Sequence, residues 1–384
     1  MCKCGLLYFK LPDFHPTFIK TDSENCLTLI IYNITMKFPQ LAGTLILGFA
    51  AISLFANCNS DGKSSGGIGK IFSSDSTKKK TDSTVNVMKP VDPKLYDSLV
   101  KKLANGDTTG RWPVKKQPYP LAGAILPFKR IVVYYGNLHS KKMGALGEYA
   151  PKEMWQRLNA EVKHWEKADP STPVQPGLHY IAAVASGTPG KDGKYINRMG
   201  NKQIDSVLKI AKMQPNTIVF LDLQVALSTI KAELPHIEKY LELPYVHLGI
   251  DPEFSMKDGT LPGKKIGTYD AADINYVTGY LADIVKKYNL PPKVFVLHRF
   301  TKKMVTNSPS IKLRPEVQVV MHMDGWGEPE LKKGTYRHFI QGEPVQFTGF
   351  KLFYKNDLKK DPKRLMTPEE LLKLTPKPIY IQYQ

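Results

Sequence analysis

The sequence predicts an α/β fold, a (β/α)8 or TIM barrel, and three observations lead to this prediction. Apolar runs that suit buried strands recur past residue 125, and amphipathic helical patterns lie between several of them. Strands that alternate with helices form parallel βαβ units. The stretch from Arg130 to Gln384 is close in length to the roughly 250 residues of a typical barrel.

Eight segments are the expected strands: 130–135, 178–185, 217–223, 245–251, 293–298, 317–324, 348–353 and 379–383. The expected helices between them are 151–167, 202–213, 225–241, 271–288 and 368–373. A doubly wound open sheet is the alternative. It favours a glycine-rich first turn, but Gly136 is the only glycine directly after the first strand, so we prefer the barrel.

Side chains alternate between the two faces of a strand, which predicts which polar groups point into the barrel. In 245–251 the apolar positions face the helices, so His247 and Asp251 face inward. The same reasoning turns a further set of polar side chains inward: Asp222, Gln224, His322 and Asp324. Polar groups thus gather at the C-terminal ends of several strands, where the active sites of TIM-barrel enzymes lie.

The Asp251-Pro252-Glu253 segment is the candidate catalytic motif. Two carboxylates a few ångströms apart split their pKa values, which leaves one protonated as an acid. We expect Glu253 to act as general acid with Asp251 assisting, and Asp222 and Asp324 to orient substrate or share the role of second carboxylate. The structural alternative is a helix-capping aspartate followed by a turn proline.

Aromatic and polar side chains at the same rim suit a sugar ring, which offers apolar faces and hydroxyl edges. The expected rim aromatics are Tyr135, Phe254, Trp326, Tyr354 and Tyr383. The residues predicted to bind substrate are Tyr135, His298, Arg299, His322, Trp326 and Gln382. The predicted partner is therefore a carbohydrate or cell-envelope polymer, and this chemistry requires no cofactor.

Three motifs carry a resemblance to a known family: His-Leu-Gly-Ile-Asp-Pro-Glu-Phe at 247–254, Leu-Pro-Gly-Lys-Lys-Ile-Gly at 261–267 and Val-Leu-His-Arg-Phe at 296–300. They resemble uncharacterised secreted bacterial proteins with a similar His-Leu-x-Leu-Asp-Pro-Glu stretch. The resemblance covers residues 128–384 and implies the barrel fold and export. More distantly, the Asp-x-Glu pair, 321–324 and 380–383 are similar to family-18 chitinases and family-25 lysozymes.

Two other functions stay open. One is a metal-dependent hydrolase, in which His247, His298 and His322, with Asp251 and Asp324 beside them, hold Zn²⁺ or Mn²⁺. The His-x-His that amidohydrolase barrels carry on their first strand is missing. The other alternative is a non-catalytic lipoprotein that binds a glycan.

The segment 36–57 predicts a lipoprotein signal peptide. A positive start at Met36 precedes an apolar run from Leu41 to Ala56, shorter than the about 20 residues that span a bilayer. Residues 54–58 resemble a lipobox, so we expect Cys58 to be lipidated and to anchor the chain in the cell envelope. An uncleaved signal anchor is the alternative. No cysteine follows Cys58, which excludes thiol catalysis and disulfides from the barrel.

The remaining segments complete the expected domain organisation. Residues 1–35 carry no fold signal, and we expect translation to start at Met36. Residues 58–115 are interpreted as a low-complexity tether with a short helix near 92–104, and residues 116–384 as the barrel.

The chain carries a net charge of +19, which favours anionic neighbours or a solubilising lysine surface. No basic run has the interleaved aromatics of a nucleic-acid groove, so no nucleic-acid partner is predicted.

Overall fold

The computed structural model describes residues 89–115 and 117–384. The predicted start at Met36, the signal peptide at 36–57, the lipidation of Cys58 and most of the tether lie outside the described residues. Within the described part of the chain, no helix combines the length and apolar character needed to span a bilayer.

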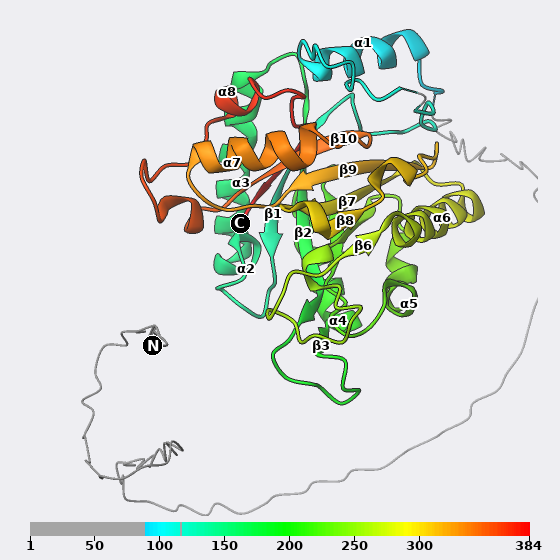
Figure 1. Ribbon diagram of the computed structural model, residues 1–384, viewed down its shortest axis with the longest axis vertical. Helices are drawn as coiled ribbons and strands as arrows, with labels where there is room; N and C mark the ends of the chain where they lie inside the picture. Colours follow the sequence, from blue (N-terminus) through cyan, green and yellow to red (C-terminus); the bar gives the residue numbers. More distant parts are fainter. Residues whose placement is uncertain (1–88, 116) are drawn as a thin grey trace, which may run out of the picture. The chain divides into compact units, whose positions relative to one another are not determined.

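Eight parallel strands close into a barrel, which confirms the predicted TIM-barrel fold (Figure 1). The barrel closes because the first strand pairs in parallel with both the second and the last. The barrel strands are β1 (Arg130–Gly136), β2 (Val174–Ala185), β4 (Ile218–Leu223), β5 (Val246–Ile250), β7 (Lys293–Arg299), β9 (Val317–Met323), β10 (Phe347–Leu352) and β11 (Tyr380–Tyr383).

Helices follow most of these strands and cover the outside of the barrel. The helices after β1, β2, β4, β5, β9 and β10 are α2 (Ala145–Glu148) with α3 (Pro151–Ala168), α4 (Asn201–Ala211), α5 (Ile230–Leu241), α6 (Ala271–Tyr288), α7 (Pro329–Tyr336) and α8 (Pro368–Leu371). Their apolar faces pack against outward strand residues such as Val246, Leu248 and Ile250, as strand alternation predicts.

Several local features differ from the sequence prediction. Helix α5 begins at Ile230 rather than at residue 225, because the Thr229 side chain caps it by accepting a hydrogen bond from the Ala232 N–H. Helix α7 was not predicted, and neither were the short strands β3 (Ile196–Arg198), β6 (Tyr269–Asp270) and β8 (Val305–Thr306). The connection from β7 to β9 holds two 3-10 turns, Lys302–Met304 and Ser308–Ser310.

Helix α1 (Pro93–Ala104) packs against the N-terminal end of the barrel. Its buried Tyr96 and Val100 pack with Leu126 against inward residues near the strand starts, among them Ile131 and Ile218. Gln318, buried inside the barrel, accepts hydrogen bonds from the backbone N–H groups of Ile125 and Leu126. These contacts fill part of this end of the barrel. A cavity of about 500 Å³, lined by Ile218, Tyr245 and His247 among others, remains beside them at the strand starts.

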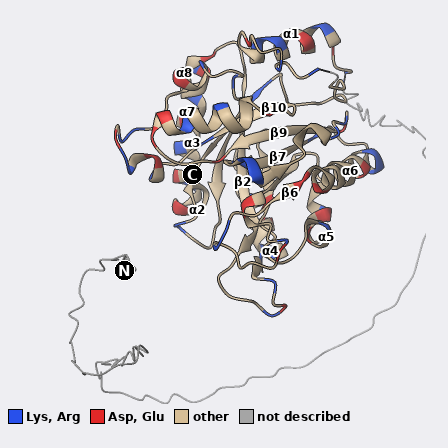
Figure 2. Ribbon diagram, viewed as in Figure 1, with Lys and Arg blue, Asp and Glu red and all other residues tan. Residues whose placement is uncertain are grey.

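Positions of Lys and Arg and positions of Asp and Glu are interspersed along the outer helices and loops (Figure 2). The excess of Lys and Arg over Asp and Glu, 54 against 35, gives the chain its net positive charge.

Candidate active site

A pocket of about 460 Å³ opens at the C-terminal end of the barrel; we call it the mouth pocket. Its polar lining comes from strand ends: Tyr135 of β1, Gln224 after β4, Asp251 after β5, Asp324 after β9 and Lys351 of β10. The carboxyl ends of parallel barrel strands meet at one face, and these distant residues therefore converge.

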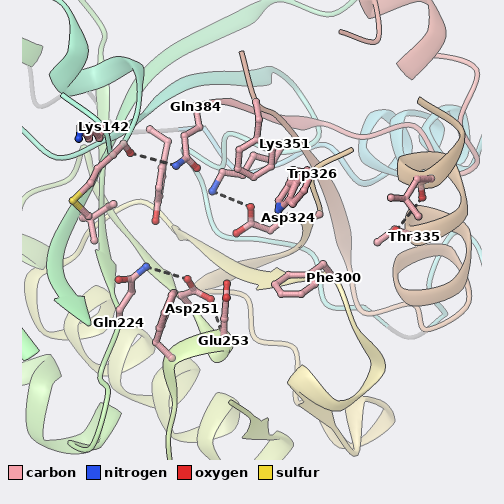
Figure 3. A pocket seen from close by; sticks show the side chains of 17 residues that line it. Lys142, Gln224, Asp251, Glu253, Phe300, Asp324, Trp326, Thr335, Lys351 and Gln384 are labelled. Carbon is pink, nitrogen blue, oxygen red and sulfur yellow. Dashed lines mark hydrogen bonds and ion pairs between the residues drawn. The ribbon is translucent and has the colours of Figure 1, made fainter. Parts of the chain in front are cut away.

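The Asp251–Glu253 motif forms the 3-10 turn Pro252–Phe254 directly after β5. Asp251 Oδ1 accepts a hydrogen bond from the Glu253 N–H at 3.0 Å, and Asp251 Oδ2 accepts one from Gln224 Nε2 at 3.2 Å. Asp251 therefore caps the turn, as the structural alternative predicted, while its carboxylate also lines the pocket. The turn places Glu253 beside Asp251 in the pocket wall (Figure 3).

Glu253 is the carboxyl group best suited to donate a proton. Burial, together with repulsion from Asp251 and Asp324, raises the pKa of Glu253 to about 8. Burial and the nearby Asp324 and Asp222, opposed by His298, raise the pKa of Asp251 to about 6. Neither side chain forms an ion pair within the described part of the chain.

A chain of buried charged groups lies at the floor of the pocket. His298 Nδ1 is 2.7 Å from Asp324 Oδ2, and His298 Nε2 is 3.4 Å from Asp222 Oδ1. Lys351 Nζ forms an ion pair with Asp324 Oδ1 at 2.9 Å and lies 3.9 Å from the centre of the Tyr135 ring. The Tyr135 hydroxyl donates to Asp222 Oδ2 at 3.0 Å. Tyr135 and the carboxylates are thereby held in fixed positions.

The two carboxylates flanking His298 favour its charged form. Burial opposes the charge on this imidazole, but Asp222 and Asp324 raise the pKa of His298 to about 10. Burial also opposes ionisation of Asp324, yet Lys351 and His298 hold the pKa of Asp324 below its ordinary value. Asp324 thus remains a carboxylate at neutral pH, which suits an orienting role better than an acid role.

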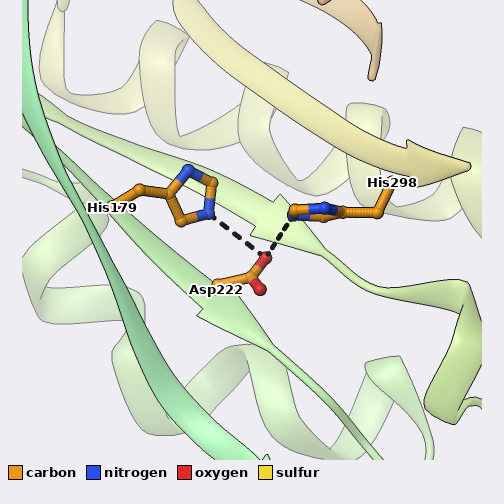
Figure 4. Close-up of side chains that lie close together, drawn as sticks. All are labelled: His179, Asp222 and His298. Atoms are coloured by element: carbon orange, nitrogen blue, oxygen red, sulfur yellow. Dashed lines mark ion pairs between the residues drawn. The ribbon is translucent and has the colours of Figure 1, made fainter. Parts of the chain in front are cut away.

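The structure adds His179 of β2 to this group. His179 Nε2 lies 3.3 Å from Asp222 Oδ1 (Figure 4). On the other side of the ring, His179 Nδ1 lies 2.6 Å from the Tyr380 hydroxyl. Burial lowers the pKa of His179 to about 4, although Asp222 opposes this shift. His179, Asp222 and His298 are fully buried, and their nearest ring nitrogens and carboxylate oxygen lie within 4.8 Å of one another.

Four predicted binding residues do not line the mouth pocket: His298, Arg299, His322 and Gln382. The predicted catalytic Asp222 does not line it either, and both Asp222 and His298 are fully buried beneath it. Arg299 faces outward, since its neighbour His298 faces inward, and its guanidinium binds Glu343 at 2.6 Å and loop carbonyls. His322 and Gln382 do point into the barrel, but both are fully buried below the pocket. Gln382 donates to the Tyr380 hydroxyl at 3.0 Å, and the His322 ring packs 5.1 Å from that of His298.

Two predicted rim aromatics also lie elsewhere, while Trp326 and Phe254 line the pocket as expected. Tyr383 faces outward, and its hydroxyl accepts a hydrogen bond from Trp165 Nε1 at 3.0 Å. Tyr354 stacks against Tyr383 and hydrogen-bonds Glu161 of α3. Strand parity accounts for this placement, because Gln382 occupies the inward position next to Tyr383.

The predicted grouping of His247 with His298 and His322 as metal ligands is wrong. His247 Nδ1 accepts a hydrogen bond from the Val294 N–H at 3.1 Å, and the His247 ring packs beside Phe220 in the barrel interior. Within the described residues, the histidine that joins His298 and a carboxylate is His179 instead.

Sequence reasoning missed His179, Lys351 and the pocket aromatics Phe300 and Phe353. A signal for three of them was present. His179 and Lys351 are the only basic side chains of β2 and β10, and period-2 alternation turns both toward the barrel interior. Phe353 shares the face of Lys351 in the predicted strand 348–353, whereas Phe300 follows β7 in a loop whose course the pattern does not predict.

Comparison with protein-family models found no match, and comparison with curated proteins found none either. Among solved structures, the chain shows a likeness to the C-terminal domain of Legionella pneumophila ChiA, at a TM-score of 0.23 and 10% identity. The alignment covers 62% of this chain and 62% of that chain, less than two thirds of its length. A TM-score this low supports no functional argument. The resemblance seen in the sequence motifs stays a prediction.

Proposed function

We propose that this barrel binds a carbohydrate in the mouth pocket and hydrolyses a glycosidic bond, with Glu253 as general acid. One observation carries the proposal: Glu253 lines an open pocket next to Asp251, and its pKa is raised to about 8. A carboxyl group that stays protonated at neutral pH beside a more acidic partner is the arrangement that glycosidic cleavage requires.

The rest of the lining is suited to a sugar. Aromatic rings from four loops and one strand offer flat apolar surfaces: Tyr135, Phe254, Phe300, Trp326 and Phe353. Trp326 is 48% exposed at the rim, with Lys359 Nζ 5.2 Å from the centre of its ring. Gln224, Lys351 and the carboxylates supply donors and acceptors for hydroxyl groups.

Each residue has a distinct role in the proposed reaction. Glu253 donates its proton to the glycosidic oxygen as the bond to the sugar carbon breaks. Asp251, fixed by Gln224, stabilises the positive charge that develops on the sugar, and Asp324, held ionised by Lys351, orients hydroxyl groups. Water then adds its hydroxyl to the sugar carbon, and its remaining proton returns to Glu253.

The test compares natural glycans with activated aryl glycosides. Glu253→Gln should lower kcat on envelope polysaccharide by about 10²–10⁴-fold, the usual contribution of a general acid. The same variant should retain most of its activity on a dinitrophenyl glycoside, because that leaving group departs without protonation. Reducing-end release and absorbance of the phenol measure the two rates.

Glu330→Gln on α7 is the matched control, because its carboxylate is 82% exposed and lies outside the pocket. It should match the wild-type chain on both substrates. An equal loss on both substrates in Glu253→Gln would contradict the general-acid role. Glycan binding without turnover by the wild-type chain would favour the non-catalytic alternative.

We also propose that Cys58 carries a lipid that anchors the protein in the bacterial cell envelope. The support is the lipobox-like segment 54–58 behind an apolar run. Cys58→Ala should move the protein from the detergent-soluble membrane fraction to the aqueous fraction, and mass spectrometry of the wild-type N-terminus should find a diacylated cysteine. An unmodified Cys58 would exclude the anchor.

A further inference from the structure

The buried groups under the mouth pocket have an imbalance of charge. Asp222, Asp251 and Asp324 are three buried carboxyl groups, and Lys351 is the one buried ammonium among the described residues that contacts any of them. Isolated buried charges are costly, so a site of this kind gains stability from additional positive charge. With His298 neutral, two further positive charges would balance the three carboxylates, and with His298 protonated one would.

Three of the buried atoms have no hydrogen-bond partner although they face one another: His179 Nε2, Asp222 Oδ1 and His298 Nε2. The Asp222 oxygen is 3.3 Å from one nitrogen and 3.4 Å from the other. Ligand atoms about 2.0–2.1 Å from a tetrahedral ion are separated by roughly 3.3–3.4 Å. The two observed separations match that geometry.

We propose that His179, Asp222 and His298 bind one divalent transition-metal ion of the Zn²⁺ class. Two imidazole nitrogens and one carboxylate oxygen are ligands that this class accepts. The ion would displace the proton of His298 and, with Lys351, balance the three carboxylates. This site goes beyond the proposed glycosidase function, since its three residues are fully buried below the mouth pocket and do not include Glu253.

Each of the three proposed ligands has a polar partner on the side that faces away from the ion, as the ligands of metal sites commonly do. His298 Nδ1 faces Asp324 Oδ2 at 2.7 Å, and His179 Nδ1 faces the Tyr380 hydroxyl at 2.6 Å. Asp222 Oδ2 accepts from Tyr135. Such partners fix each ligand and leave the opposite nitrogen or oxygen free for the ion.

Gly249 of β5 borders the same three residues. A Cβ at this position would lie 2.3 Å from Asp222 Oδ1 and 2.6 Å from His179 Nε2. Only glycine therefore leaves these two ligand atoms unobstructed, which is an observation independent of the charge imbalance.

Co²⁺ is the probe for the experiment. The purified full chain is treated with chelator, its cysteines are alkylated to remove thiolate ligands, and Co²⁺ is titrated while the visible spectrum and bound cobalt are measured. We expect one equivalent to bind, with a ligand-field band and no thiolate charge-transfer band, and Zn²⁺ should displace it.

Substitutions test which residues bind the ion. His179→Gln and Asp222→Asn should abolish the cobalt band, while Asp324→Asn, which acts through His298, should weaken binding about 10–100-fold. His322→Gln is the matched control, because it removes a buried imidazole 5.1 Å from His298 but outside the ligand set. It should bind Co²⁺ as the wild-type chain does.

The proposal is overturned if the alkylated wild-type chain binds no Co²⁺ or Zn²⁺, a result that does not depend on any variant folding. It is also overturned if His179→Gln and Asp222→Asn, folded by circular dichroism, bind as tightly as wild type. Neither measurement uses glycan turnover, so failure of this site and failure of the proposed glycosidase function are distinguishable.

Discussion

At the scale of single residues, the environment of each carboxyl group decides its role. Glu253 and Asp251 are two residues apart, yet burial and neighbouring charges raise the pKa of Glu253 to about 8 and that of Asp251 to about 6. Asp324 lies in the same pocket but remains ionised because Lys351 and His298 neutralise it. The mouth pocket therefore holds one carboxyl group that is protonated at neutral pH, one that ionises near pH 6 and one that stays ionised.

These pKa values predict a bell-shaped pH dependence of kcat/KM on polysaccharide. Activity should rise as pH increases through about 6, where Asp251 ionises, and fall through about 8, where Glu253 loses its proton. Because the two carboxyl groups interact, each limb of the pH profile reports the titration of the pair and not of one residue alone. Asp324→Asn removes a charge that raises the pKa of Glu253, so its alkaline limb should move to lower pH. An unmoved limb would show that Asp324 does not influence the acid.

At the scale of elements, the alternation of side chains along each strand predicted much of the site. It correctly turned Asp222, Asp251 and Asp324 inward. Applied to the strand 293–298 and its next residue, it would also have turned His298 inward and Arg299 outward. It could not identify the turn after β5, in which Asp251 caps the 3-10 helix and so directs Glu253 into the pocket. Turns of this kind depend on individual hydrogen bonds rather than on a repeating pattern.

Gly249→Ala tests how closely β5 packs against the buried groups. The new Cβ would lie 2.3 Å from Asp222 Oδ1, so we expect the free energy of unfolding to fall by about 1–3 kcal/mol. Gly334→Ala on α7 is the control, because nothing lies within 4 Å of its Cβ position, and the helix should gain about 0.5–1 kcal/mol. Denaturant unfolding measures both, and an unaffected Gly249→Ala chain would mean that the groups move aside at little cost.

At the scale of the whole molecule, the two ends of the barrel have different surroundings. Helix α1 and the segment around Leu126 pack against the strand starts, and the mouth pocket occupies the strand ends. Near the strand starts, Lys293 is fully buried, and its ammonium donates to the carbonyls of Leu243 at 2.6 Å and Val246 at 2.9 Å. No carboxylate of the described chain pairs with it.

Lys293 should make global stability depend on pH. Burial lowers its pKa from 10.5 to about 7 in the folded chain, so between these values the unfolded chain binds more protons. The free energy of unfolding should therefore rise with pH across this window, and Lys293→Met should flatten the rise. Lys163→Met, at an exposed position on α3, should leave the slope unchanged. Equal slopes in wild type and Lys293→Met would exclude the effect.

The sequence by itself determined the barrel and the inward direction of most site residues, because strand and helix periodicities are local properties of the chain. Only the tertiary structure decided which inward residues meet. His179 and His298 are far apart in sequence, and barrel closure brings both beside Asp222 at nearly equal distances. Which inward side chains lie side by side depends on the stagger between paired strands, and this stagger depends on the packing of the complete barrel. The same packing placed Glu253 in an open pocket and His322 in the sealed interior.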